Sequence, residues 1–211
     1  MIGREGIDAV SLRQIAAEVG QSNPAAVQYH FGDREGLLDA IYRYRLDHLD
    51  RVRAKLMADA EPAALRDPRR LLEFLALPVA CIVNARGSYS YARFMVRMEH
   101  ALGGPVSSSR VRDYGATMQV IGLLKDALGE IPPDIADIKI TLSMRLAMIA
   151  LISVEDRRMQ PWGSVEDEEA IAVGLDMAAA GLGCRVSDPA LVRSRLEEAR
   201  QISAGLLVPA A

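Results

Sequence analysis

Apolar residues recur along most of this chain at spacings of three and four, which is the period of an α-helix. Glycine and proline divide these stretches, because both residues interrupt regular helical backbone. No stretch between the breaks alternates apolar and polar residues as a half-buried strand would. The breaks lie at Gly20, Gly32, 62–68, Gly87, 103–105, 132–133, 161–163 and 188–189. This pattern predicts an all-α protein of eight or nine helices.

The composition is that of a folded chain, since 50% of the 211 residues are hydrophobic and 25% are charged. The longest apolar run, 146–152, is too short to span a bilayer, and nothing at the N-terminus resembles a signal peptide. Cys81 and Cys184 lie far apart in sequence, which favours reduced thiols over a disulfide or a metal site. We therefore expect a cytoplasmic protein with no membrane segment.

Two short helices are predicted near the N-terminus, at 11–18 and 22–31, and a longer helix at 33–58. Gly20 ends the first of them, and a proline in the first turn of the second is tolerated there. The side chains suited to N-cap the three helices are Ser11, Ser22 and Asp33. Two short helices joined by a glycine-containing turn are typical of a helix-turn-helix unit that binds DNA.

The second short helix carries side chains that could read DNA. Glutamine and asparagine bond adenine edges in the major groove, and alanine can meet a thymine methyl. Within this frame we expect the Tyr29 hydroxyl to reach a phosphate while its ring stays packed. His30 suits packing as well as DNA contact, and Phe31 is expected in the core in either case.

The spacing of residues between positions 10 and 38 is specific. The residues concerned are Val10, Ser11, Ile15, Ala16, Gly20, Ser22, Tyr29, His30, Phe31, Arg34, Glu35, Leu37 and Leu38. With them, residues 5–45 resemble the TetR (tetracycline repressor-like) family of bacterial transcriptional regulators. The resemblance implies a helix-turn-helix DNA-binding domain at 1–45 and a helical ligand-binding and dimerisation domain at 46–211.

The expected DNA contacts combine this resemblance with side-chain chemistry. The family usually has lysine on a phosphate where this chain has Arg34, and arginine can make the same contact. Arg13 and Gln14 could touch backbone or a base edge, although a solvated surface role is about as plausible for both. The full set is Ser11, Arg13, Gln14, Gln21, Ser22, Asn23, Ala25, Gln28, Tyr29, His30 and Arg34.

The chain departs from the family pattern in two respects. The stretch from Gly20 to Tyr29 is one residue longer than the commonest version, so the base-reading positions within 21–26 can shift by one. Family members also have a first helix, most of which would precede the start of this chain and which would end near residue 6. Either the start codon is misassigned, or this form lacks part of its DNA-binding core. For the chain as written, we expect residues 1–45 to be loosened. That core is expected from Leu12, Ile15, Val19, Val27, Phe31 and Leu38.

The charge balance gives no general attraction to nucleic acid. The net charge is −3, and residues 1–60 hold eight basic and nine acidic side chains. DNA affinity must then come from a segregated face, and we expect it to depend on dimerisation and to fall with salt.

Three further helices are predicted at 71–83, 90–102 and 106–128, the first apolar on all sides and interrupted by Pro78. Stripes of methionine and aromatic residues on the second and third are core residues by default. The resemblance implies a small-molecule site among them, where methionine adapts to varied apolar ligands. The candidate ligand residues are Phe94, Met95, Arg97, Met98, Tyr114 and Met118, with Arg97 or His100 as polar anchor.

Helices at 134–154 and 165–182 each carry two apolar stripes, one for the chain's own core and one for a partner. The resemblance implies a homodimer in which they pair with their copies as a twofold four-helix bundle. The predicted interface residues are Leu142, Ile149, Ile171, Leu175 and Ala178. A last helix at 189–207 adds to the minimal family plan.

Catalytic motifs are absent from the sequence, and the acidic run at 166–169 is explained by a helix N-terminus rather than a metal. We expect no catalytic residues, metal or cofactor. The preferred hypothesis is a dimeric repressor that binds a double-stranded DNA operator and is released by a small-molecule inducer. The alternative is a dimeric helical ligand-binding protein that has lost DNA binding through N-terminal truncation.

Overall fold

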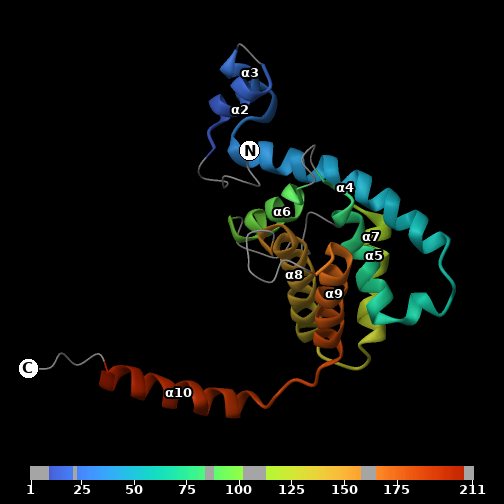
Figure 1. The fold of residues 1–211 in the computed structure, drawn as a ribbon, viewed down its shortest axis with the longest axis vertical. Coiled ribbons are helices and arrows are strands. Elements are labelled where there is room, and N and C mark those ends of the chain that lie inside the picture. The colour runs from blue at the N-terminus through green and yellow to red at the C-terminus, as the bar shows by residue number, and fades with distance from the viewer. Residues whose placement is uncertain (1–9, 21–22, 84–87, 102–112, 158–164, 207–211) are drawn as a thin grey trace, which may run out of the picture.

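The computed structural model describes residues 10–20, 23–83, 88–101, 113–157 and 165–206. These residues form nine α-helices and one short 3-10 helix, joined by turns and loops and without a strand, which confirms the all-α prediction (Figure 1). They are α2 (Leu12–Glu18), α3 (Pro24–Phe31), α4 (Arg34–Ala58), η1 (Ala64–Arg66), α5 (Pro68–Ala80), α6 (Ser90–Ala101), α7 (Gly115–Ala127), α8 (Pro133–Arg157), α9 (Asp167–Gly183) and α10 (Pro189–Leu206).

Two hydrophobic clusters are joined by α4, which runs from the α2–α3 pair into the bundle of α5 to α9 (Figure 1). Ala16, Val27 and Leu37 form the small cluster, while the large one takes residues from α4 to α9. Ile41, on α4, packs against both. The expected domain boundary at residue 45 lies inside this helix, so one rigid element belongs to both parts.

Local signals set the ends of the first three helices. Ser11 and Gln14 form a capping box on α2, and the Asp33 side chain accepts from the Gly36 amide at the start of α4. The N-cap of α3 is Asn23, whose side chain accepts from the Ala25 amide, so the assignment of Ser22 as the cap is wrong. The reason is that Pro24 occupies the first helical turn, which makes the residue before it the cap.

Two of the predicted helices differ from those in the structure. α5 continues through Pro78 to Ala80, because burial of its apolar surface offsets the one hydrogen bond that proline removes. The helix expected at 106–128 is described only from α7 at Gly115, since Tyr114 is its N-cap with extended backbone. Residues 102–112 lie outside the described residues.

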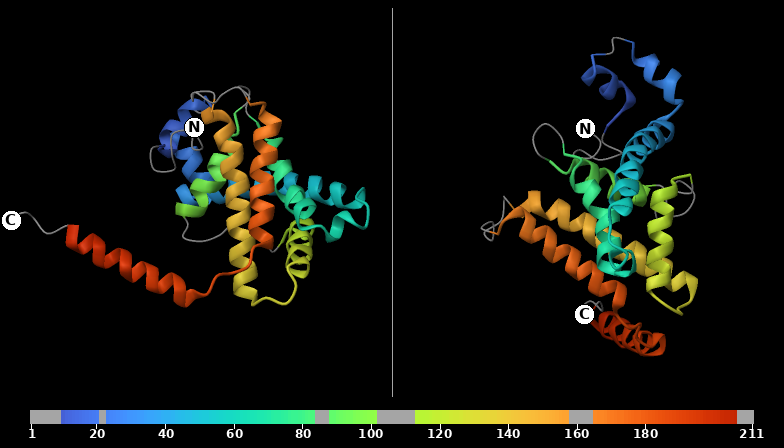
Figure 2. Two further views of the ribbon diagram at one scale, coloured as in Figure 1. Left: turned by 60° about the horizontal axis from the view of Figure 1, so that its bottom comes forward. Right: turned by 90° about the vertical axis from the view of Figure 1, so that its right-hand side faces the viewer.

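Helices α8 and α9 pack side by side along much of their lengths (Figure 2). They approach each other closely at Gly174, where an added Cβ would lie 2.1 Å from the Cβ of Ala150. The Ser143 hydroxyl donates to the Ala178 carbonyl at 2.8 Å, and Lys139 Nζ donates to the Leu182 carbonyl at 2.6 Å. The second bond satisfies a carbonyl at the end of α9 that has no partner within its own helix.

α10 leads away from the other helices, and the residues described along it are exposed (Figures 1 and 2). It carries four large exposed apolar side chains, Leu191, Val192, Leu196 and Ile202. None of the described helices is long and apolar enough to cross a membrane.

Candidate DNA interface and ligand cavity

The outward face of α3 presents the predicted DNA-reading side chains. Ala25, Gln28 and Tyr29 are all exposed, and their spacing of three and four places them on one side of the helix. Val27 lies on the opposite side and is buried in the small cluster. The α3 sequence contains no acidic residue that would repel a phosphate. Gln21 and Ser22 lie outside the described residues.

Aromatic residues at the end of α3 are more exposed than expected. The Tyr29 ring is 86% exposed and meets the His30 ring edge-on, with centroids 5.4 Å apart. His30 is exposed as well, and Phe31, expected in the core, is 38% exposed. The prediction that the Tyr29 ring packs is therefore wrong, because α3 turns this side away from the small cluster.

Three of the predicted contact residues also make local hydrogen bonds. Gln14 Oε1 accepts from the Ser11 amide at 2.7 Å, and the Gln14 amide donates to Ser11 Oγ at 3.2 Å. Asn23 Oδ1 accepts from the Ala25 amide at 3.0 Å. All three residues remain exposed, so capping fixes their positions near the helix N-termini without burying them.

The two predicted basic contacts differ in their surroundings. Arg13 is exposed on α2. Arg34 is half-buried, and its guanidinium donates to the Val10 carbonyl at 3.0 Å. Arg34 thus ties the start of α4 to the residue that precedes the α2 cap, which is a structural role that the sequence did not predict.

The small cluster differs from its predicted membership. Leu12 and Ile15 pack against it, and Val27 is part of it, as expected. Val19 is 70% exposed because it lies beyond the end of α2, and Leu38 belongs to the large cluster instead. Residues 1–9, where the expected remnant of a first helix lies, are outside the described residues.

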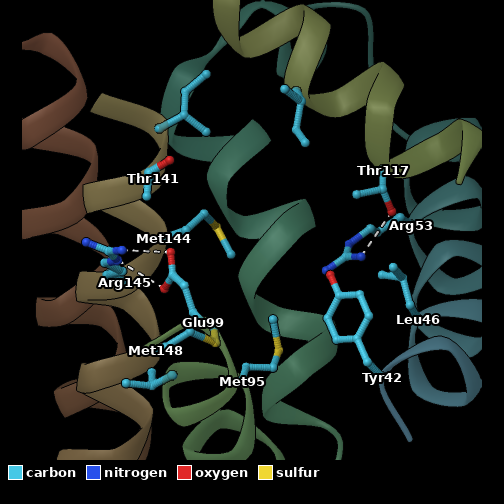
Figure 3. Close-up of a pocket in the computed structure, with 13 residues that line it drawn as sticks. Tyr42, Leu46, Arg53, Met95, Glu99, Thr117, Thr141, Met144, Arg145 and Met148 are labelled. Atoms are coloured by element: carbon cyan, nitrogen blue, oxygen red, sulfur yellow. Dashed lines mark hydrogen bonds and ion pairs between the residues drawn. The ribbon is translucent and has the colours of Figure 1, made fainter. Parts of the chain in front are cut away.

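A cavity of about 100 Å³ lies among α4, α6, α7 and α8 (Figure 3). Its wall is mainly apolar, with methionines from α6 and α8. The lining residues are Tyr42, Leu46, Arg53, Met95, Val96, Glu99, Thr117, Ile121, Ile140, Thr141, Met144, Arg145 and Met148.

Of the six predicted ligand residues, only Met95 lines this cavity. Phe94 and Met98 are buried in the large cluster, where Phe94 stacks on Tyr91 with ring centroids 5.7 Å apart. Met118 also packs against that cluster. The other two are Arg97, which is half-buried, and Tyr114, which caps α7. The prediction failed for these residues because helical spacing identifies an apolar face but does not tell which residues of that face line a cavity.

Arg53 is the polar residue of the cavity that the sequence analysis missed. It is 2% exposed and lies on α4 at helical spacing from buried apolar residues. The buried stripe consists of Leu38, Tyr42, Leu46, Leu49, Arg53 and Met57. An arginine within an apolar stripe is a signal that the sequence does contain, because a charge is rarely buried without a specific reason.

The Arg53 guanidinium bonds two neutral oxygens. It donates to Thr117 Oγ1 at 3.1 Å and to the Leu75 carbonyl at 2.7 Å. Burial lowers the pKa of Arg53 to about 10, with opposing contributions from Tyr42, Tyr91 and Asp50. Since this pKa remains well above neutrality, Arg53 is a cation at pH 7.

The second charged group of the cavity is an ion pair on the opposite wall (Figure 3). Arg145 Nε and Nη2 lie 3.0 and 2.9 Å from the two carboxylate oxygens of Glu99. The Glu99 hydrogen bond raises the pKa of Arg145. This pairing joins α6 to α8 and leaves no net charge on that wall.

The exposed side of α8 and α9 forms a second candidate surface. Leu142 and Ile149 are 54% and 48% exposed, which agrees with their predicted outward position, and Val173 and Met177 of α9 are exposed too. Leu175 and Ala178 are buried in the large cluster, and Ile171 packs against it. The assignment of Leu175 and Ala178 to a partner-facing stripe is wrong, because both cover the chain's own core, whereas Ile171 is half-buried.

The fold and the exposed face of α3 define a helix-turn-helix DNA-binding protein with a helical bundle attached. Residues 1–41 match the model of the family described as bacterial regulatory proteins, tetR family. This match supports a TetR-family regulator, and the all-helical architecture of the rest of the described chain is consistent with that family. A search of curated proteins finds none that matches the chain.

Metal-binding groups are not a feature of the described part of the chain. No cluster of three or more His, Cys, Asp or Glu side chains is placed there to hold an ion. The cysteines Cys81 and Cys184 are free and exposed.

Proposed function

We propose that this protein is a homodimeric repressor that binds a double-stranded DNA operator and releases it when a small-molecule inducer occupies the cavity. In this proposal residues 1–45 bind DNA, and residues 46–211 bind the inducer and form the dimer. The protein would act in the cytoplasm, where bacterial DNA lies.

The observation that carries the proposal is the position of α4. Its first turns hold Leu37 in the small cluster with α2 and α3, and later turns present Leu46 and Arg53 to the cavity. Ile41 packs against both clusters. A ligand that displaces α4 would therefore move the helix-turn-helix unit with it, because a straight helix transmits displacement along its length.

A second copy of the chain supplies the other recognition helix. The exposed apolar side chains Ile138, Leu142 and Ile149 of α8 lie beside Val173 and Met177 of α9, a face suited to a twofold four-helix bundle. In such a dimer two α3 helices reach half-sites about one DNA turn apart. An inducer would shift the population between arrangements that fit this spacing and arrangements that do not.

The proposal is tested with the full-length chain by selecting bound sequences from random double-stranded DNA. We expect enrichment of a twofold-symmetric sequence, with an affinity that falls steeply as salt rises. A double variant, Gln28→Ala with Tyr29→Ala, is the matched control, since both side chains are exposed and their loss should spare the fold. If a folded dimer enriches no sequence, the alternative of a ligand-binding protein without DNA binding replaces the repressor.

A further inference from the structure

Arg53 carries a buried positive charge into the wall of the cavity. Its guanidinium lies between Tyr42 and Thr117 (Figure 3). The partners of its two bonded nitrogens, a hydroxyl and a backbone carbonyl, are both neutral. The third nitrogen, Nε, is buried and has no hydrogen-bond partner in the described part of the chain. A buried N–H without a partner is costly and is rarely retained without a use.

The nearby carboxylate of Asp50 is committed elsewhere. Asp50 Oδ1 accepts from the Thr117 amide at 2.7 Å and from the Thr117 hydroxyl at 2.6 Å. Both bonds lie in the first turn of α7, where the helix dipole attracts a negative charge. Asp50 therefore caps α7 and reaches Arg53 only through the Thr117 hydroxyl, which donates to Asp50 and accepts from Arg53.

The other carboxylate of the cavity, Glu99, is neutralised by Arg145 on the opposite wall. Among the described lining residues, the charges therefore sum to one positive charge, that of Arg53, which the Asp50 carboxylate stabilises from a distance without a direct hydrogen bond. The rest of the wall is apolar and includes Met95, Met144 and Met148, whose flexible side chains adapt to the shape of a ligand.

We propose that the cavity binds a small organic anion, a carboxylate with an apolar body, whose oxygens accept a hydrogen bond from Arg53 Nε. This inference rests on the proposed function, because it names the chemical class of the inducer. The carboxylate would pair directly with Arg53, whose present direct partners are neutral, and the apolar body would lie against the methionines. The cavity of about 100 Å³ suits a body on the order of one aromatic ring or a short acyl chain.

The test compares probes that share a body and differ in the head group. Benzoate, benzyl alcohol and benzylamine form one series, and hexanoate, hexanol and hexylamine form another. Binding to the full-length wild-type chain is measured by isothermal titration calorimetry at pH 7. We expect a carboxylate to bind at least about tenfold more tightly than its alcohol, since hydrogen bonds to charged groups are the stronger ones, and the amines not to bind. Equal binding of acid and alcohol, or no binding of either acid, would overturn the inference.

Variants assign the effect to Arg53. Arg53→Met removes the charge at similar length and should abolish the preference for carboxylate over alcohol, whereas Arg53→Lys keeps the charge and should retain part of it. Arg51→Met is the matched control, because Arg51 lies on the same helix as Arg53 but is exposed and does not line the cavity. Arg51→Met should retain the preference. If Arg53→Met does not fold, as judged by circular dichroism, Arg53→Lys and the wild-type probe series decide.

The inference and the proposed function fail separately. A chain that selects an operator but binds no carboxylate remains a repressor with another kind of inducer. A chain that prefers carboxylates through Arg53 but selects no DNA has the proposed ligand class without the repressor function.

Discussion

Neighbouring side chains on the same helix of this protein differ in burial, and therefore in role, according to the side of the helix on which they lie. On α3, Val27 is buried while Gln28 and Tyr29, the next two residues, are exposed. On α4, Arg53 is buried within an apolar stripe whereas its neighbours Arg51 and Lys55 are exposed. A residue type alone therefore does not reveal the role, since the side of the helix on which a side chain lies decides whether it is buried or exposed.

The exposed residues of α3 should separate affinity from sequence preference. Tyr29→Phe removes one hydroxyl and should weaken binding to every DNA sequence equally, by about 0.5–1.5 kcal/mol. Gln28→Ala should instead relax base preference at one position of each half-site, by about 1–3 kcal/mol. Fluorescence anisotropy with the selected operator and its single-base variants measures both effects.

Tyr44→Phe provides the control for this pair, because Tyr44 is another exposed tyrosine but lies on α4, outside α3. It should leave DNA affinity unchanged. Losses of the same size and the same lack of sequence dependence for Tyr29→Phe and Gln28→Ala would contradict the separate roles.

At the scale of the helices, a few close contacts fix the position of α9 against its neighbours. α8 and α9 meet at Gly174 and are joined by the hydrogen bond from Ser143 to the Ala178 carbonyl. The side chain of Arg69 on α5 donates to Asp176 on α9 at 2.7 Å, although a pair this exposed contributes little stability. Close packing at Gly174 therefore matters more for the position of α9 than this ion pair does.

Gly174→Ala should destabilise the protein, because the new Cβ would lie 2.1 Å from the Cβ of Ala150 and would force the two helices apart. Overpacking of this kind costs about 1–3 kcal/mol. Thermal unfolding followed by circular dichroism should show a lower midpoint.

Gly122→Ala is the matched control on α7, since an added Cβ there meets nothing within 4 Å. It should raise the midpoint slightly, because alanine is the better helix former by roughly 0.5–1 kcal/mol. A Gly174→Ala variant as stable as Gly122→Ala would show that α8 and α9 are not in close contact at this point.

At the scale of the whole molecule, the described residues of the last three helices expose apolar side chains in two places. One is the outward face of α8 and α9, with Leu142 and Val173, and the other is α10, with Leu196 and Ile202. The proposed homodimer uses the first. The two places can be tested independently because they lie on different elements (Figure 2).

Leu142→Arg should convert the dimer into a monomer, since a charge would enter a desolvated interface without a partner. Leu142 is 54% exposed in the protomer, so the monomer itself should remain folded. Light scattering gives the molar mass, and circular dichroism checks the helical content.

Leu196→Arg on α10 is the matched control, because Leu196 is exposed to the same degree, 52%. The dimer should persist in this variant. Dissociation by Leu196→Arg but not by Leu142→Arg would place the interface on α10. By contrast, Leu175→Arg should unfold the chain, because Leu175 is 5% exposed in the large cluster.

The all-α class, the helix-turn-helix unit and the span of α4 were predictable from the sequence. Each rests on signals that act within a few residues: the 3.6-residue period, the N-cap side chains of Ser11 and Asp33, and the breaks at Gly20 and Gly32. The exposure of Gln28 on α3 followed from the same local geometry.

Only the tertiary structure decided which stripe of α9 faces inward, and that Met95 borders the cavity while Met98 is core. It also showed that Arg53 is buried at the cavity and that its Nε–H has no hydrogen-bond partner in the described part of the chain. Burial depends on which distant element packs against a side chain, here α7 against α4 and α8 against α9. The helical period places side chains on a face, but it carries no information about the partner that covers that face or the space left between them.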